Sequence, residues 1–328
     1  MAYTNIDDPS AYFQTALHSS AGSATITNDG NSDLQPDLIW SKARGAAYNH
    51  GLYDSSRGVT KFLNCNTTSG ETTASSGYDL TSFNTDGFST GNNQYNTICG
   101  GTTYAAWQWK ANGGTTATNS DGSLSSVVQA NTTAGFSIVT WTVTAGGAKT
   151  IGHGLGVAPD VIIVKNRTLV TGWGVWHKDL ADTDNNLRIN DNSAEVDDAL
   201  WNDTVPTSSV FSIGAAAEVS NNSIAYCFAE KKGYSKFGSY IGNASADGPF
   251  VFTGFKPAFV MLKILPHGGW DWAIMDNKRT PTNANGTYEW LWANLAGAEF
   301  TDGDSGINME LDFLSNGFKI RTARDELN

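Results

Sequence analysis

The sequence is poor in charged residues and in proline. Asp, Glu, Lys and Arg make up 16% of its 328 residues, and there are 8 prolines, whereas charged residues form about 25% of an average soluble domain. Long runs of Ala, Leu, Glu and Lys are also missing, while Gly, Asn, Thr and Ser separate short apolar runs. This composition disfavours long helices and favours many short strands joined by turns.

Basic residues are especially scarce. The chain has 20 Lys and Arg against 32 Asp and Glu, a net charge of −12, and no basic cluster, so we expect no binding of nucleic acid. The N-terminal "MAYTNIDDPSAYF" lacks the basic and apolar regions of a signal peptide. No run approaches the about 18 apolar residues of a membrane span, so we expect no membrane insertion.

Cys65, Cys99 and Cys227 form no CxxC motif, which predicts buried free thiols made in a reducing cytoplasm.

Motifs of catalysis are missing as well. The sequence contains no HExxH, no GxSxG and no phosphate-binding loop, and its five histidines are scattered. We therefore expect no enzyme, no catalytic residue and no cofactor. The acidic stretch "TDGDSG" makes Asp302 and Asp304 weak candidates for a structural Ca²⁺, although the spacing of a helix-loop-helix calcium site is not present.

What the sequence does contain is a repeat. A proline, a short apolar run and a lysine six residues after the proline recur three times: "PDLIWSK" (36–42), "PDVIIVK" (159–165) and "PAFVMLK" (257–263). An aromatic or imidazole side chain precedes each proline by 17 or 18 residues, at His18, Trp141 and Tyr240. A phenylalanine follows each proline, at Phe88, Phe211 and Phe318. Repeats at such offsets indicate copies of one structural unit.

The repeat divides the chain into units of domain size. We predict an N-terminal arm and first unit at 1–110, a Gly/Ser/Thr/Asn-rich linker at 111–134, a second unit at 135–232 and a third at 233–328. The first two units end in aromatic-rich strands, "YAAWQWK" (104–110) and "IAYCFAE" (224–230). Only ten residues follow Phe318, and "TARDELN" does not resemble such a strand. We expect the third unit to lack its last strand and a neighbouring chain to cover the open edge.

The predicted fold is all-β, with tandem antiparallel β-sandwich units, two complete and the third truncated. The proline-led run is the central strand of each unit, and it is followed by a hairpin partner. Lys42, Lys165 and Lys263 end these strands, so we expect their stems to lie on the sheet with the ammonium groups in water, or to pair with an acid such as Asp54. A short helix is possible near 192–201.

Tryptophans in spaced pairs are the candidate binding residues. Such rings stack on sugars, and loops on a rigid sandwich commonly carry binding residues. The alternative is that these side chains fill small cores. The candidates for contact with a glycan or another partner are Trp173, Trp176, Trp270, Trp272, Trp290 and Trp292.

Taken together, the segments resemble a family of virion proteins from bacteriophages of marine bacteria. The likeness covers nearly the whole chain, including "IDDPSAYFQTALHSSAGSATITNDGNSDLQPDLIW", "IGHGLGVAPDVIIVK", "AYCFAEKKGYSKFGSYIGNASADGPFVFTGFKPAFVMLK" and "DFLSNGFKIR". The resemblance implies a structural or tail-fibre-like protein without catalytic residues.

We therefore expect a tail-associated virion component, a spacer or adhesin assembled in the host cytoplasm, that contacts other virion proteins and host surface polysaccharide and forms a homo-oligomer. A capsid decoration protein on the head is the alternative, and a glycan depolymerase is a third.

Overall fold

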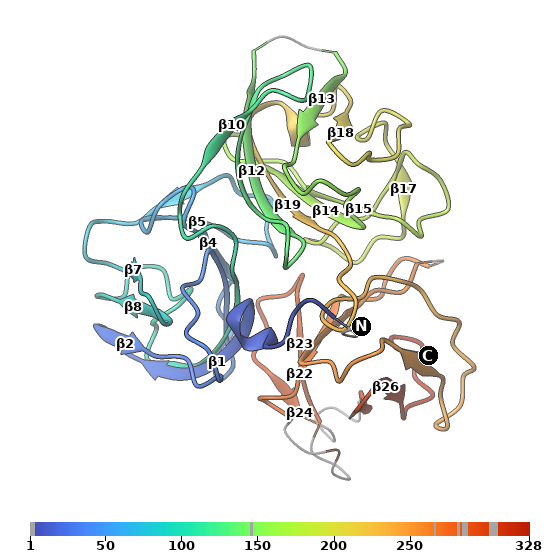
Figure 1. Ribbon diagram of the computed structural model, residues 1–328. Coiled ribbons are helices and arrows are strands. Elements are labelled where there is room, and N and C mark those ends of the chain that lie inside the picture. The colour runs from blue at the N-terminus through green and yellow to red at the C-terminus, as the bar shows by residue number, and fades with distance from the viewer. Residues whose placement is uncertain (1–3, 145–146, 266, 281–282, 284–287, 302–307) are drawn as a thin grey trace.

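Three lobes surround a common centre in the computed structural model, which describes residues 4–144, 147–265, 267–280, 283, 288–301 and 308–328 (Figure 1). The described chain is built from antiparallel sheets, and its helical content consists of two short 3-10 turns, η1 (Pro9–Ala11) and η2 (Ala217–Val219). The all-β prediction is confirmed. No helix in the described ranges has the length and apolar character needed to cross a membrane.

The first lobe, blue to cyan in Figure 1, contains two sheets. The large sheet has the order β1 (Phe13–Ser20), β9 (Thr102–Trp109), β3 (Leu38–Ala43), β4 (Gly51–Asp54), β5 (Lys61–Leu63) and β6 (Thr72–Thr73). The small sheet has the order β2 (Ala24–Ile26), β8 (Phe88–Thr90) and β7 (Leu80–Phe83).

The second lobe repeats this plan with additional strands. Its large sheet has the order β10 (Ala117–Asn119), β11 (Ser126–Asn131), β12 (Phe136–Val143), β19 (Asn221–Phe228), β14 (Val161–Asn166) and β15 (Trp173–His177). Its small sheets are the pair β13 (Lys149–Gly152) and β18 (Val210–Ile213), and the pair β16 (Asn185–Asn186) and β17 (Val196–Asp197).

The third lobe, orange to red in Figure 1, has a shorter large sheet. Its order is β21 (Phe259–Leu262), β22 (Ala273–Asp276), β23 (Glu289–Trp292) and β24 (Phe300–Thr301). The small sheet has the order β20 (Phe250–Phe252), β26 (Gly317–Ile320) and β25 (Leu311–Leu314).

The proline-led phrase forms the equivalent strand in all three lobes. β3, β14 and β21 each pair with the strand that follows them in the chain, as a hairpin partner should. Every residue of β3 and β14 is buried, because one face of the large sheet packs on the small sheet and the other packs on the neighbouring lobes. Such two-sided burial explains the continuous apolar run in "DVIIVK".

Four apolar clusters follow from this two-sided packing. Three of them lie between the large and small sheets of one lobe each. The fourth, which we call the central core, joins the opposite faces of the three large sheets and includes Trp40, Trp107, Ile163, Tyr226 and Ile274. The lobes are therefore held together by a shared core and are not separate beads.

Each lobe also contains the same pair of rings. The side chain that the sequence repeat placed ahead of the proline packs edge-on against the repeated phenylalanine of the small sheet. The pairs are His18–Phe88, Trp141–Phe211 and Tyr240–Phe318, with ring centroids 5.5, 5.7 and 6.2 Å apart. His18 is thus a packing residue, and burial lowers the pKa of its imidazole to about 4.

Two local predictions are wrong. Residues 111–134 are not a free linker, since β10 and β11 extend the large sheet of the second lobe, where β11 pairs with β12 over five residues. The apolar positions of "SVVQAN" are sufficient for a strand once a sheet edge is available as a template. Residues 192–201 form no helix but contain β17, and Ala199 has a positive φ of 53° that interrupts any helical turn.

The ring pairs predict the cost of truncating the repeated phenylalanine. Phe211 is 1% exposed in the core of the second lobe, so Phe211→Ala should reduce the free energy of unfolding by about 3–5 kcal/mol, because it removes buried surface and leaves a cavity. Urea denaturation followed by tryptophan fluorescence measures this loss. Phe250→Ala, at a side chain 44% exposed, is the control and should change stability by about 0.5 kcal/mol or less. Equal losses in the two variants would contradict the sandwich packing.

Candidate functional site

Five of the six tryptophan candidates lie inside the protein. Trp173, Trp176, Trp272, Trp290 and Trp292 are at most 7% exposed, and only Trp270 is half-buried. The five rings are therefore largely withdrawn from the surface, although Trp176 borders one cavity and Trp173 and Trp272 border another. Asp302 and Asp304, the calcium candidates, lie outside the described residues. Within the described part of the chain, no group of three His, Cys, Asp or Glu residues is arranged to hold a metal ion.

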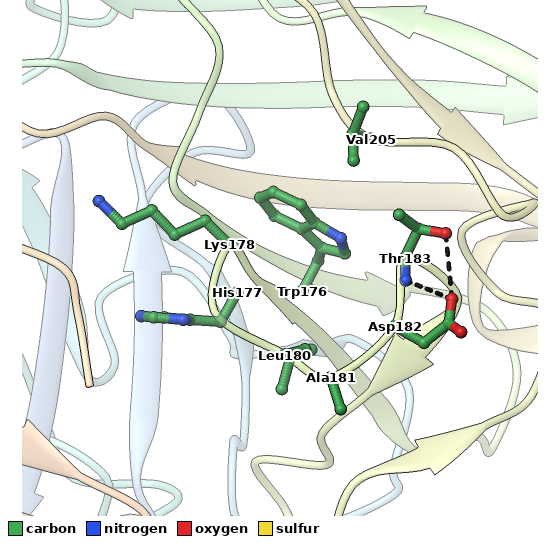
Figure 2. A pocket seen from close by; sticks show the side chains of 8 residues that line it. All are labelled: Trp176, His177, Lys178, Leu180, Ala181, Asp182, Thr183 and Val205. Carbon is green, nitrogen blue, oxygen red and sulfur yellow. Dashed lines mark hydrogen bonds between the residues drawn. The ribbon is translucent and has the colours of Figure 1, made fainter. Parts of the chain in front are cut away.

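One tryptophan lines a small surface cavity. The cavity measures about 240 Å³ and is bordered by Trp176, Val205 and side chains between His177 and Thr183 (Figure 2). Its carboxylate belongs to Asp182, which accepts hydrogen bonds from the backbone N–H and the hydroxyl of Thr183 (Figure 2). Oδ1 of this carboxylate therefore already accepts hydrogen bonds within its own turn.

The lysines at the ends of the central strands correct another prediction. Lys42 and Lys165 are 0% exposed, so their ammonium groups are not in water, and neither pairs with Asp54. Lys42 Nζ donates to the carbonyl of Ala296 in the third lobe at 3.1 Å, and Lys165 Nζ donates to the carbonyl of Thr68 in the first lobe at 3.0 Å. Burial lowers the pKa of each to about 8. These lysines connect lobes.

A second repeated motif, which the sequence interpretation missed, lies beside these lysines. "LNCN" (63–66), "LRIN" (187–190) and "LWAN" (291–294) follow the hairpins of the three lobes, and Leu63, Leu187 and Leu291 occupy matching register positions. The asparagine that ends each motif accepts a hydrogen bond through Oδ1 from a backbone N–H at the start of the hairpin strand β4, β15 or β22, or one residue before it. The pairs are Asn66 with His50, Asn190 with Trp173 and Asn294 with Trp272.

The side chains of His50, Trp173 and Trp272 form a cycle of hydrogen bonds between lobes. Trp173 Nε1 donates to the carbonyl of Asn64 at 3.1 Å, and Trp272 Nε1 donates to that of Arg188 at 3.0 Å. His50 Nε2 closes the cycle with the carbonyl of Trp292 at 3.0 Å. The three acceptors are the second residues of the three motifs. We call this set the inter-lobe cycle, and it gives the molecule an approximate threefold arrangement.

A thiol makes a further hydrogen bond between two of the lobes. Cys65, in the first motif, donates through Sγ to the carbonyl of Ala293 at 3.2 Å, and it is fully buried. The three cysteines are free and buried, as predicted.

A polar socket receives the aromatic side chain at the centre of each closing strand, the name used here for β9 and β19. Tyr226 OH in β19 donates to Asp54 Oδ2 at 2.8 Å, and Trp107 Nε1 in β9 donates to Asp276 Oδ2 at 3.0 Å. Both aromatics reach from one lobe into the next, so each socket is completed only by a neighbouring lobe.

Each of the two sockets contains its own buried arginine. Arg57 Nε and Arg279 Nε donate to Asp54 and Asp276 at 2.5 Å, and both pairs are shielded from solvent. The charge balance is completed by Glu71 and Glu299, which accept from these arginines and also from Arg167 and Arg44 of the next lobe. The pattern Asp-x-x-Arg in "DSSR" and "DNKR" was a sequence signal for these sockets.

The third lobe is different because it has no closing strand among the described residues. In the first two lobes, β9 lies between β1 and β3, and β19 lies between β12 and β14. In the third lobe, β21 pairs with β22 on one side, and β21 is the end of its sheet on the other. A cavity of about 1100 Å³, lined by residues 233–242 and by β21, lies on that side and reaches the central core. The predicted open edge is therefore present in the structure.

Comparisons with known proteins give a family without a stated activity. Residues 8–328 match the model of a family described as Domain of unknown function (DUF7483). No curated protein and no solved structure matches the chain.

The sockets predict a large cost for removing a buried carboxylate. Asp54→Ala should lower the free energy of unfolding by about 3–5 kcal/mol, because Arg57 would remain buried without its counter-charge. Asp29→Ala is the control, since the pair of Asp29 with Lys278 is exposed on both sides and should contribute about 1 kcal/mol or less. Urea titrations measure both, and a loss for Asp54→Ala as small as that of the control would contradict the socket.

The inter-lobe cycle predicts acid sensitivity through His50. Its Nδ1 accepts from Trp40 Nε1 at 2.8 Å, so the neutral ring is required, and burial followed by the nearby Lys42 charge lowers its pKa to about 3. The unfolded chain then binds more protons at this site between about pH 6.5 and 3, so stability falls as the pH falls through this window.

His50→Gln should remove that contribution. The difference in unfolding free energy between wild type and variant should shift by about 1.4 kcal/mol for each pH unit below 6.5. Urea titrations of wild type and variant between pH 6.5 and 5 measure it. A His50→Gln slope equal to that of wild type would mean that the folded and unfolded states bind protons equally at His50, which would contradict the neutral buried ring.

Proposed function

The chain belongs to the DUF7483 family, and on that premise we propose that it is a non-enzymatic structural protein of a bacteriophage virion, associated with the tail. The observation that carries the proposal is the open edge of β21. An unpaired sheet edge is a template for association, so a protein that keeps one beside an apolar cavity is suited to an assembly in which another subunit covers it.

The use of polar groups supports a scaffold in preference to an enzyme. The buried lysines Lys42 and Lys165 donate to carbonyls of other lobes, and the buried carboxylates Asp54 and Asp276 are neutralised by arginines. Chemistry needs such groups to be available to a substrate, whereas here they connect lobes. A depolymerase is for this reason not favoured, and contact with host glycans through the five buried tryptophans is not part of the proposal.

A second candidate function is a decoration protein on the phage head. The observation that favours it is the inter-lobe cycle, in which His50, Trp173 and Trp272 make equivalent contacts around one centre. A subunit with approximate threefold symmetry matches positions of local threefold symmetry in a shell. Both functions use the chain as a building block, and they differ in its place on the particle.

Immunogold electron microscopy of intact virions of the phage that encodes this chain tests the proposal. We expect antibodies raised against the purified protein to label the tail at a fixed position. Labelling of the shell would replace the tail role by the head role. Purified virions that contain neither label nor peptides of this chain by mass spectrometry would refute a structural role. Virions incubated with pre-immune serum are the control.

A further inference from the structure

We propose that the space between residues 237–242 and β21 is a docking slot for an extended segment of a partner polypeptide, which adds the missing closing strand. The partner is defined by its chemistry: a β-strand with the alternation of aromatic and small side chains seen in β9 and β19. This inference goes beyond the virion role and does not depend on it, because it rests on the internal repeat of the chain.

Both sides of the slot are already in place. On one side, Tyr240 packs on Phe318 as His18 and Trp141 pack on their phenylalanines, and its hydroxyl donates to the carbonyl of Leu327. On the other side, β21 keeps the hairpin register of β3 and β14. The third lobe has therefore not collapsed around the missing strand. It retains the two flanks between which a strand lies in the other lobes.

The space between the flanks is real and apolar. The cavity of about 1100 Å³ is lined on its two sides by Tyr240 and Ile241 and by Phe259, Met261 and Leu262. Ile241 is 90% exposed, and β21 is buried at one of its four positions, whereas β3 and β14 are buried throughout. This exposure of large apolar side chains is what removal of one strand from a finished sheet would produce.

The finished lobes specify the register and side chains of the guest strand. Trp107 lies opposite Trp40 and Tyr226 opposite Ile163, so the guest places an aromatic residue opposite Met261. Trp109 and Phe228 lie opposite the first residues of β3 and β14, so a second aromatic residue lies opposite Phe259. Ala106 and Ala225 lie opposite Ser41 and Val164, the residues just before Lys42 and Lys165, on the other face of the sheet. The guest strand therefore requires a small residue opposite Leu262.

The socket that would receive the first aromatic residue has changed in a matching way. By the repeat it belongs to the second lobe, where His177 stands at the position of Asp54 and Asp276, and Leu180 at that of Arg57 and Arg279. His177 lines the cavity, and Leu180 and Leu265 pack on the central core. Only the socket that faces the empty slot lacks the ion pair, so an apolar ring such as Phe fits it.

A partner polypeptide fits better than a second copy of this chain. The described residues contain two strands of the closing type, β9 and β19, and each is paired on both sides within its own sheet. A copy that donated one of them would open a slot of its own, with no net gain in paired strands. A different chain that carries a spare segment of this type has no such cost.

Hydrogen–deuterium exchange of the full chain with a synthetic peptide tests the slot. The probe is residues 221–230 with Tyr226→Phe and Cys227→Ser, and the control peptide also carries Ala225→Pro, which removes a backbone donor and an extended conformation. We expect the probe to slow exchange of β21 amides about tenfold or more, leave β3 and β14 unchanged, and bind at least about tenfold more tightly than the control.

Variants of the chain locate the binding. Met261→Lys places a charge under the guest aromatic and should weaken the probe at least about tenfold, whereas Met261→Leu keeps the apolar surface and should bind as wild type does. Circular dichroism confirms that both variants are folded.

Four results would overturn the proposal. The first is no protection of β21 at millimolar probe, and the second is equal binding of the two peptides. The third is protection of β21 in the chain alone, either at all concentrations or through concentration-dependent self-association, which would assign the slot to this chain or to a second copy. The fourth is occupation of the cavity by the dye 1-anilinonaphthalene-8-sulfonate without competition by the probe, which would indicate a small apolar ligand.

Discussion

The hydrogen bonds between lobes are the constraint on which the rest of the structure depends. His50, Trp173 and Trp272 each contact a backbone carbonyl of the next lobe. The carbonyls of Asn64 and Trp292 lie just after or within a strand of a large sheet, and that of Arg188 follows Leu187, which bridges to β15. One face of each large sheet is therefore turned toward the centre of the molecule, where it packs against the corresponding faces of the other two large sheets. That arrangement explains why Lys42 and Lys165 can be buried, because carbonyls of another lobe replace water around their ammonium groups.

The sequence predicted the parts of the fold that local pattern determines. The repeated phrase identified β3, β14 and β21, and the offsets to His18, Trp141 and Tyr240 identified the rings that pack on the small sheets. All-β composition and buried free thiols were also predicted correctly. The open edge of the third lobe was foreseen from the absence of an aromatic strand after Phe318.

The sequence could not predict contacts that join distant segments. The acceptor of Lys42 is 254 residues away, and a lysine at the end of a strand ordinarily reaches water, so its burial could not be read from neighbours in the chain. The tryptophans were misplaced for a related reason, because Trp173 and Trp272 are needed at lobe contacts that are created only when three lobes meet. Residues 117–131 were assigned to a linker since their composition is polar, although an adjacent sheet edge is enough to order them.

The position of Cys65 has a consequence for anyone who handles this protein. Its thiol is buried at the contact between the first and third lobes, where the carbonyl of Ala293 accepts its hydrogen bond. Burial raises the pKa of the thiol well above its usual range. Cys65 is also among the residues that line the cavity beside β21, so a maleimide or an oxidant reacts with this buried sulfur only when that cavity or the contact between the two lobes opens. The rate of modification of this thiol thus reports how often the structure around Cys65 opens.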